Sequence, residues 1–196
     1  GAIVTSGDVA NFGTGGVTLG SDSTVDTTSA TPAGANIIFG AGIAGAFDLG
    51  LTAGTGGAVT VATTTNITDL TLTSAATNTF AGSVTVNDLI TTANSGTVTL
   101  NGAANTFVAQ VDFLNTGLVT LGNGGDSSTF ANGVTFSANA ASNFGGAIVT
   151  SGDLADFGTG GVTLGSDSTV DTTNAGGSVA GGDIAFGAGI AGAFDL

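Results

Sequence analysis

The chain repeats a long stretch of its own sequence almost without change. Residues 1–28 and 146–173 match at an offset of 145, except at Val9/Leu154 and Asn11/Asp156. Self-similarity over a long period is typical of proteins that stack structural units along one axis. We therefore divide the chain into one long solenoid repeat, residues 1–145, and the start of a second copy, residues 146–196, which continues the first without a linker.

A change of offset locates a loop inside the repeat. Residues 37–49 correspond to residues 184–196, apart from one residue, at an offset of 147 instead of 145. The two copies thus differ in length by two residues in the stretch that lies between Ser29 and Ile37 in the first copy and contains Pro32. Exposed loops tolerate such changes of length. We expect this stretch to be an exposed loop on a regular scaffold.

Short segments in which a Thr stands between two apolar residues recur along the chain. In this alternation the apolar residues point to one face of a strand and the Thr to the other, and β-branched residues suit such a half-buried surface. The segments are 17–19, 59–61, 70–72, 84–86, 98–100 and 134–136. Turns are predicted at the Gly- and Asn-rich clusters 56–57, 94–96 and 122–125. The chain is therefore predicted to be all-β.

The spacing of the Phe residues indicates the length of one coil. Phe80, Phe107, Phe130, Phe157 and Phe186 follow one another at intervals of 27, 23, 27 and 29 along the chain. Phe12 and Phe39 repeat the interval of 27, whereas the step from Phe39 to Phe80 is 41 and breaks the pattern. A β-sandwich would not require this periodicity, but stacked coils bring like residues into register. We predict a parallel β-solenoid without disulfides, with coils of about 23–29 residues and each Phe stacked on the next.

The amino-acid composition excludes most reaction chemistry. The chain has no Lys, Arg, His or Cys, and all 14 of its charged side chains are Asp, which gives a net charge of −14. Serine hydrolysis would lack its base, and zinc or iron catalysis would lack imidazole and thiolate ligands. The uncompensated negative charge disfavours nucleic acid as a partner. We expect no enzyme activity and no catalytic residue, and no apolar run reaches the roughly 18 residues of a transmembrane helix.

The Asp residues leave two interpretations open. They can keep a rod soluble by mutual repulsion, which we favour, or they can collect divalent cations such as calcium. Asp22, Asp26 and Asp126 are the weak candidates for metal ligands, and the 122–126 segment partly resembles the Gly-Gly-x-Gly-x-Asp turns of calcium-binding β-rolls. That turn does not recur every nine residues, as calcium β-rolls require. The segments 26–28 and 171–173 lack the Gly of the aspartic-protease motif.

The Thr content raises ice binding as an alternative function. An ice-binding solenoid displays Thr-x-Thr pairs outward at the same site in successive coils. In this chain such pairs, at 71–73 and 97–99, are exceptions among the segments with a single central Thr. Solvent-facing strand Thr residues therefore remain the favoured interpretation.

Several short motifs resemble the strand repeats of large bacterial exoproteins. The motifs are Gly-Ala-Val-Thr-Val at 57–61, Gly-Thr-Val-Thr-Leu at 96–100, Ala-Asn-Thr-Phe at 104–107 and Gly-Ser-Asp-Ser-Thr-Val-Asp-Thr-Thr at 20–28. They are similar to filamentous-haemagglutinin-like and autotransporter adhesins. The resemblance implies a secreted or surface-attached right-handed β-helix that acts as a stalk, an adhesin or a biofilm matrix filament. It supplies no catalytic residue and does not indicate which receptor, if any, is bound.

The repeat pattern also predicts a partner. The sequence starts and stops within the pattern and shows no polar or helical cap, and an open coil exposes unpaired strand edges and apolar layers. We expect self-association end to end, or continuation in a longer repeat chain.

Overall fold

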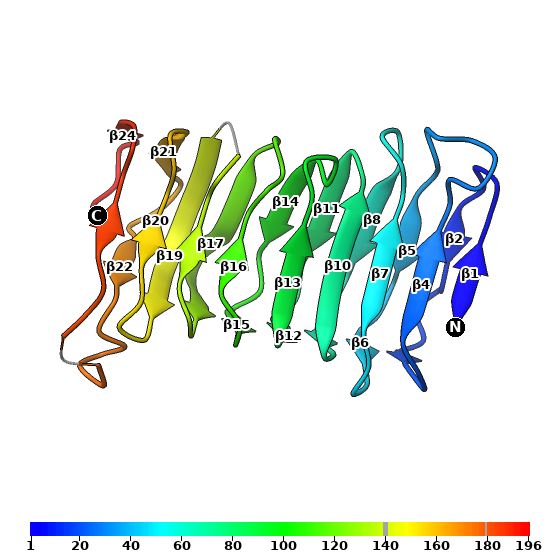
Figure 1. The fold of residues 1–196 in the computed structure, drawn as a ribbon, viewed down its shortest axis with the longest axis horizontal. Coiled ribbons are helices and arrows are strands. Elements are labelled where there is room, and N and C mark those ends of the chain that lie inside the picture. Colours follow the sequence, from blue (N-terminus) through cyan, green and yellow to red (C-terminus); the bar gives the residue numbers. More distant parts are fainter. Residues whose placement is uncertain (139–140, 179) are drawn as a thin grey trace.

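The protein forms a rod of stacked β-coils. The computed structural model describes residues 1–138, 141–178 and 180–196, and none of them is helical. The coils make about eight turns, and the two termini lie at opposite ends of the rod (Figure 1). Every pairing between strands is parallel within the described residues, as in the β1–β4 and β11–β14 pairs. The predicted all-β parallel solenoid is confirmed.

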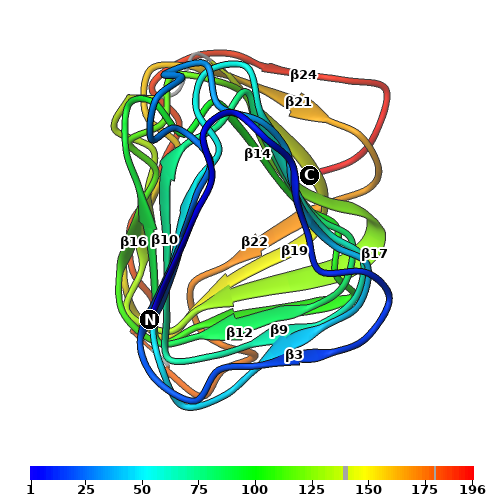
Figure 2. The ribbon, with the colours of Figure 1, turned by 90° about the vertical axis from the view of Figure 1, so that its right-hand side faces the viewer.

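Each coil contributes a strand to each of three faces, and the rod is roughly triangular in cross-section (Figure 2). The first face holds two sheets. Its strands are β1 (Ala2–Val4), β4 (Ser23–Asp26), β7 (Leu49–Thr52), β10 (Asp69–Ser74), β13 (Asp88–Thr91), β16 (Val111–Asp112), β18 (Val134–Thr135), β20 (Ala155–Asp156) and β23 (Ile184–Ala185).

The second and third faces are joined by two long strands, β17 (Val119–Phe130) and β19 (Ala141–Thr150), which bend from one face to the other. The second face also holds β2 (Ala10–Asn11), β5 (Ile37–Phe39), β8 (Ala58–Val61), β11 (Thr77–Phe80), β14 (Thr97–Leu100), β21 (Gly161–Leu164) and β24 (Ile190–Ala191). The third face also holds β3 (Val17–Thr18), β6 (Ile43–Ala44), β9 (Thr65–Asn66), β12 (Val84–Val86), β15 (Ala104–Phe107) and β22 (Thr169–Asp171).

The alternating segments behave as the sequence predicts. In β8, Val59 and Val61 are fully buried while Thr60 between them is exposed. The same arrangement recurs in β12, where Val84 and Val86 point inward and Thr85 outward. A single hydrophobic core therefore runs along the axis of the rod, lined by the inward residues of all three faces.

The coils vary in length more widely than the Phe spacing predicts. Leu70 is in register with Leu89 in the next coil, which is a shorter step than any of the Phe intervals. The longest step leads from Ala155 to Ile184. The extra residues of the long coil lie between β22 and β23, where the described residues 174–178 are mostly exposed, so corner loops, not strands, absorb the difference.

The prediction that the five Phe residues form one stack is wrong. Phe80 lies on the second face, in register with Leu100. Phe107 and Phe130 pair with each other on the third face, with ring centroids 4.9 Å apart. Phe157 and Phe186 stack next to the first face, at 4.9 Å. The interior therefore contains three columns of apolar side chains, one for each face.

The irregular step between Phe39 and Phe80 has a simple structural explanation. Phe39 is in register with Val61, and Val61 is in register with Phe80. Two short coils thus separate the two Phe residues, and Val61 occupies the place of a Phe in the column. Phe12 lies next to Phe39 in the same column, with ring centroids 4.4 Å apart.

The Gly-rich cluster 122–125 is not the turn that the sequence predicts. It lies inside β17, at the corner where this strand passes from the second to the third face. The pairing of β17 with β19 shifts register between Leu121 and Asp126. Three Gly residues with positive φ allow this bend without ending the strand.

The two copies of the repeated sequence have the same strand pairing but lie on different faces. Ala2 pairs with Thr24 on the first face, and the equivalent Ala147 pairs with Thr169 on the third. The long repeat is therefore not a whole number of coils, and the second copy is turned about the rod axis by one face of three. In both copies the described residues of the loop that differs in length are mostly exposed, as the sequence predicts.

Candidate interaction surfaces

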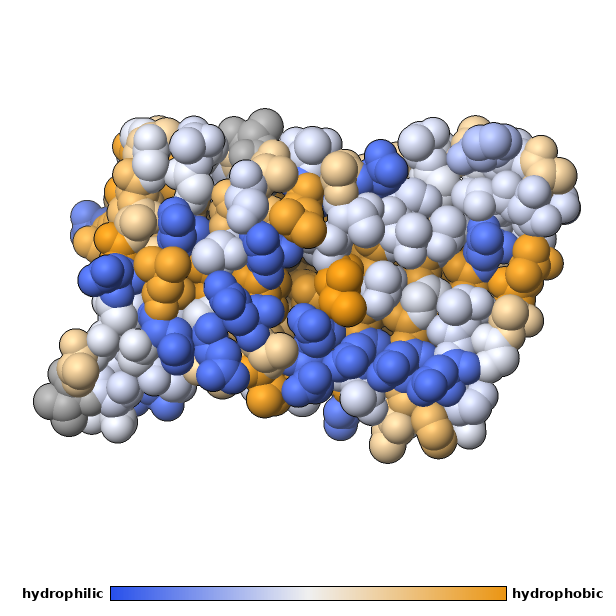
Figure 3. Space-filling model, in the orientation of Figure 1, coloured by the Kyte–Doolittle hydropathy of each residue, from blue (hydrophilic) through white to orange (hydrophobic). Residues whose placement is uncertain are grey.

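A row of four Asp residues follows the edge of the first face where its strands begin. Asp69 is in register with Asp88, and the register of β10 with β7 and of β7 with β4 adds Asp48 and Asp22 to the row. Adjacent strands lie about 4.8 Å apart, so four carboxylates follow one another at this spacing. Figure 3 shows the row as a hydrophilic band along the lower edge of the first face. We call this set the aspartate row.

Backbone amides partly balance the charge of the aspartate row. Oδ1 of Asp22 accepts a hydrogen bond from the amide of Asp48 at 3.2 Å, and Oδ1 of Asp69 accepts one from the amide of Asp88 at 3.0 Å. The second copy repeats the arrangement, because Oδ1 of Asp167 accepts from the amide of Asp195 at 3.2 Å. Each of these carboxylates therefore binds the backbone of the next coil, which ties successive coils together.

Asp88 has a raised pKa. Partial burial raises the pKa of its carboxyl above the ordinary value, and the neighbouring charge of Asp69 raises it further. The folded state therefore binds the proton of Asp88 more readily than the unfolded state does. The ionised carboxylate opposes folding at neutral pH, and this penalty disappears as the pH falls through the pKa.

We expect Asp88→Asn to stabilise the protein at neutral pH by about 0.5 kcal/mol, because it removes a partly buried charge and a like-charge pair between adjacent strands. The difference from the parent chain should vanish at about pH 3, below the usual aspartate pKa, where Asp88 is protonated in both states. Guanidinium unfolding followed by circular dichroism at the two pH values measures this. An advantage that persists undiminished in acid would contradict the electrostatic explanation.

Asp171 provides a control of opposite sign. Hydrogen bonds from the Thr173 hydroxyl and from the amides of Ala175 and Thr173 lower the pKa of its carboxyl. Its two oxygens accept from Thr173 at 2.7 Å and from Ala175 at 2.8 Å. Asp171→Asn should therefore weaken the fold at neutral pH, and the loss should disappear as the pH falls.

The three weak candidates for metal ligands do not converge. Asp22 precedes β4 and Asp26 ends it, so the two lie roughly 13 Å apart along an extended strand. Oδ1 of Asp26 accepts from the amide and hydroxyl of Thr28 at 2.7 and 2.6 Å. Asp126 lies at the corner of β17, where its Oδ2 accepts from the amide of Asn123 at 2.8 Å. Among the described residues, no three acidic side chains form a group that could hold a metal ion.

The two Asp-Thr-Thr segments are copies of one turn. In both, the Asp oxygen binds the second Thr, and the first Thr donates across the corner loop, to the carbonyl of Ala35 in the first copy and of Gly182 in the second, each at 2.9 Å. Asp26 ends β4, Asp171 ends β22, and these strands lie near opposite ends of the rod (Figure 1). They cannot form a pair of catalytic carboxylates.

The second face displays a column of Thr residues on an uncharged surface. Strand register aligns Thr60, Thr79, Thr99 and Thr120 in four consecutive coils, all partly or fully exposed. Thr77 and Thr97 form a second, shorter column beside the first. The parts of the strands that the structure describes on this face contain no Asp before the corner of β17. Two Thr-x-Thr pairs, 77–79 and 97–99, therefore lie at the same site in adjacent coils.

Sequence reasoning missed both surfaces. The dipeptide Asp-Leu recurs at 48–49, 69–70 and 88–89 and is a signal that could have revealed the aspartate row. The Thr pairs look scattered because the corner loops between them differ in length. Register, which the sequence does not state, brings them together.

Comparison with protein-family models, with curated proteins and with solved structures gives no match to this chain. Among the described residues there is also no helix of the length and apolarity needed to cross a membrane. The geometry of the three faces and of the rod ends is therefore what indicates a function.

Proposed function

We propose that this chain is a structural segment of an extracellular or cell-surface filament, an adhesin stalk or a biofilm matrix fibre, and that it has no catalytic role. Stacked coils supply rigidity along one axis, because each strand is hydrogen-bonded to the coils on both sides. The chain holds no side chain that could serve as a general base other than Asp, and its Asp residues are spread along the rod.

One observation carries the proposal: the same sequence occurs twice in the rod, and in both copies its strands pair with the following coil in the same register. Residues 10 and 11 pair with 37 and 38 in the first copy, and 155 and 156 pair with 184 and 185 in the second. A unit that fits onto its predecessor in this way can be repeated many times, which suits a fibre. Turning by one face per repeat would present the aspartate row in three directions around such a fibre.

Electron microscopy of the native material tests the proposal. We expect unbranched rods whose width is that of one solenoid and whose length exceeds that of the 196-residue chain. Helical reconstruction should show strands perpendicular to the rod axis at about 4.8 Å. Small dispersed particles without rods would contradict it.

Ice binding is a second candidate, which the Thr column on the uncharged second face favours. Hydroxyl and methyl groups repeated at a fixed spacing on a flat sheet can order water. Thr99→Tyr should abolish any thermal hysteresis, because a bulky ring breaks the flat column. Thr85→Tyr, on the third face, is the matched control and should leave it unchanged. A parent chain without thermal hysteresis would remove this candidate.

A further inference from the structure

We infer that the outer surface of the first coil, residues 1–19, is a docking surface for a solenoid coil with the sequence of residues 126–145. The inference deepens the proposed rod function, on which it rests, by naming the partner of one end and the register of the contact. The chain contains the same surface twice, once uncovered and once covered.

The covered copy shows what the surface binds. Residues 146–164 repeat residues 1–19 with only two changes. They stack on the preceding coil through three parallel pairings, β19 with β17, β20 with β18 and β21 with β19. The described residues of that preceding coil are 126–138 and 141–144. Transferred to the first copy, the same register would place Ala2 opposite Ser127 and Ala10 opposite Val134.

The exposure of equivalent residues differs in the way this predicts. Ile3 is 48% exposed, whereas its equivalent Ile148 is 1% exposed. Phe12 is only partly buried, whereas Phe157 is fully buried. The apolar side chains of the first coil are therefore suited to burial. At the second copy a preceding coil buries them, whereas at the first copy they remain exposed.

The aromatic contacts identify what is missing at the first copy. Phe12 stacks on Phe39 of the following coil, as Phe157 stacks on Phe186. Phe157 also contacts two rings of the preceding coil, Phe136 at 5.5 Å and Phe144 at 4.8 Å. The structure contains no ring in those two places beside Phe12, within the residues it describes.

A cavity at the first coil provides the space for these rings. It has a volume of about 340 Å³, opens at the end of the rod, and is lined by Ile3, Phe12, Val17, Leu19, Val25 and Phe39 among others. Its lining is mostly apolar, so the side chains of Phe136 and Phe144 from a docked coil would fill it in the way they fill the equivalent space at Phe157.

The last coil of a second 196-residue chain is not the partner. That coil, with β22, β23 and β24, repeats the sequence of the second coil, β4, β5 and β6. In the first copy the second coil is covered by β7, β8 and β9. We therefore expect the last coil to be covered by a coil with the sequence of residues 49–66, and not by the surface of residues 1–19.

The test is a chain in which residues 49–145 are added directly before Gly1, so that the new junction repeats the Gly145–Gly146 junction. Hydrogen exchange with mass spectrometry can separate residues 1–19 from residues 146–164, because Val9 and Asn11 differ from Leu154 and Asp156. We expect amides of residues 2–11 to exchange at least about 100-fold more slowly in the extended chain, at a rate close to that of residues 147–156. Unchanged exchange would overturn the inference.

The control carries Phe144→Asp in the added segment only, which should restore fast exchange in residues 1–19 while residues 146–164 remain protected. Slow exchange of residues 1–19 in the unextended chain at high concentration would assign the surface to a second copy's last coil and would also overturn the inference. Failure of the proposed function is distinguishable from both, because it would appear as an absence of rods in native material while the added coil still docks.

Discussion

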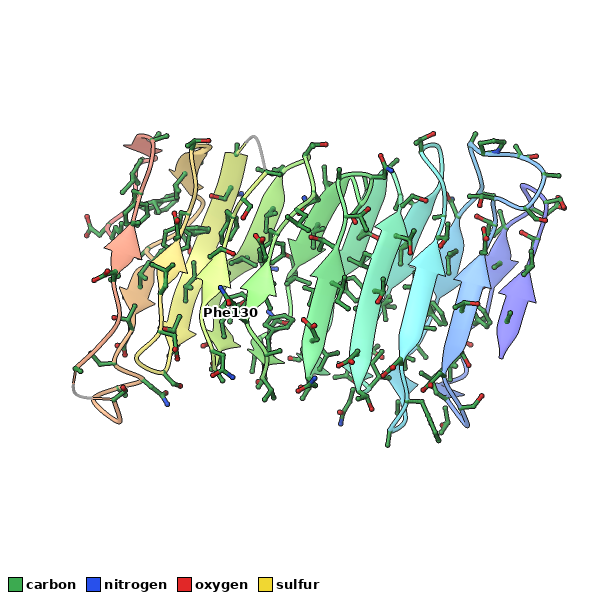
Figure 4. All side chains as sticks on the ribbon, in the orientation of Figure 1. Phe130 is labelled. Carbon is green, nitrogen blue, oxygen red and sulfur yellow. The ribbon has the colours of Figure 1, made fainter. Side chains whose placement is uncertain are left out.

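Phe130→Ala is expected to destabilise the protein by about 3–5 kcal/mol, the largest effect of any single side-chain truncation that we predict. Phe130 is fully buried in the column below the third face, and its ring stacks on Phe107 at 4.9 Å and meets Phe113 edge to face at 6.4 Å. Figure 4 shows its position among the side chains of the central coils. Truncation leaves a cavity that a regular stack of coils cannot close without breaking strand register. Guanidinium unfolding followed by circular dichroism measures the loss, since the chain has no Trp or Tyr.

Phe194→Ala is the matched control. Phe194 is 47% exposed near the end of the rod, so its removal should cost less than about 1 kcal/mol. A loss at Phe130 no larger than the loss at Phe194 would mean that the interior is not packed as described.

Gly146→Ala is expected to cost about 3 kcal/mol or more, because it combines backbone strain with overpacking. Gly146 lies at the corner of β19 with φ of 143°, which an L-residue rarely adopts, and a Cβ atom there would lie 2.2 Å from the carbonyl oxygen of Asp126. The obstacle is backbone of the neighbouring coil and cannot move alone. The same unfolding measurement applies.

Gly1→Ala tests this explanation with the same local sequence, because Gly1 is the equivalent of Gly146 in the first copy. No atom lies within 4 Å of a Cβ at Gly1. The substitution should change stability by less than about 0.5 kcal/mol. Equal losses at the two positions would contradict the explanation that the preceding coil constrains Gly146.

The Phe residues show why the sequence predicted the fold but not its internal register. Phe107 and Phe130 are one coil apart, and the assignment to one column holds for this pair. Phe80 and Phe107 are separated by a similar interval, but they lie on different faces. The chain completes one coil between Phe80 and Leu100 and then continues to the next face, which holds Phe107. Because corner loops vary in length, the same interval can separate two Phe residues in one column or two Phe residues on different faces. Only the strand pairing distinguishes the two.

The candidate surfaces could be predicted only in part. Asp22 was singled out as a possible metal ligand and instead belongs to the aspartate row, where its carboxylate binds the amide of Asp48. Asp26 and Asp126 each bind the backbone of their own turn. A single sequence shows which residues could bind a cation but not the distances between them, and those distances decide whether a site exists.

The long repeat and the alternating segments were by themselves sufficient to predict stacked half-buried strands. Alternation of apolar residues with Thr is a local property, and repetition of the same residues is a periodic one, so both can be recognised along the chain. The face that each strand occupies is different, because it depends on the lengths of all the preceding corner loops, and it became known only from the folded coils. Those lengths turn the second copy by one face and align the aspartate row and the Thr column. The folded coils also show that the surface of residues 1–19 has its equivalent in the interior at the second copy.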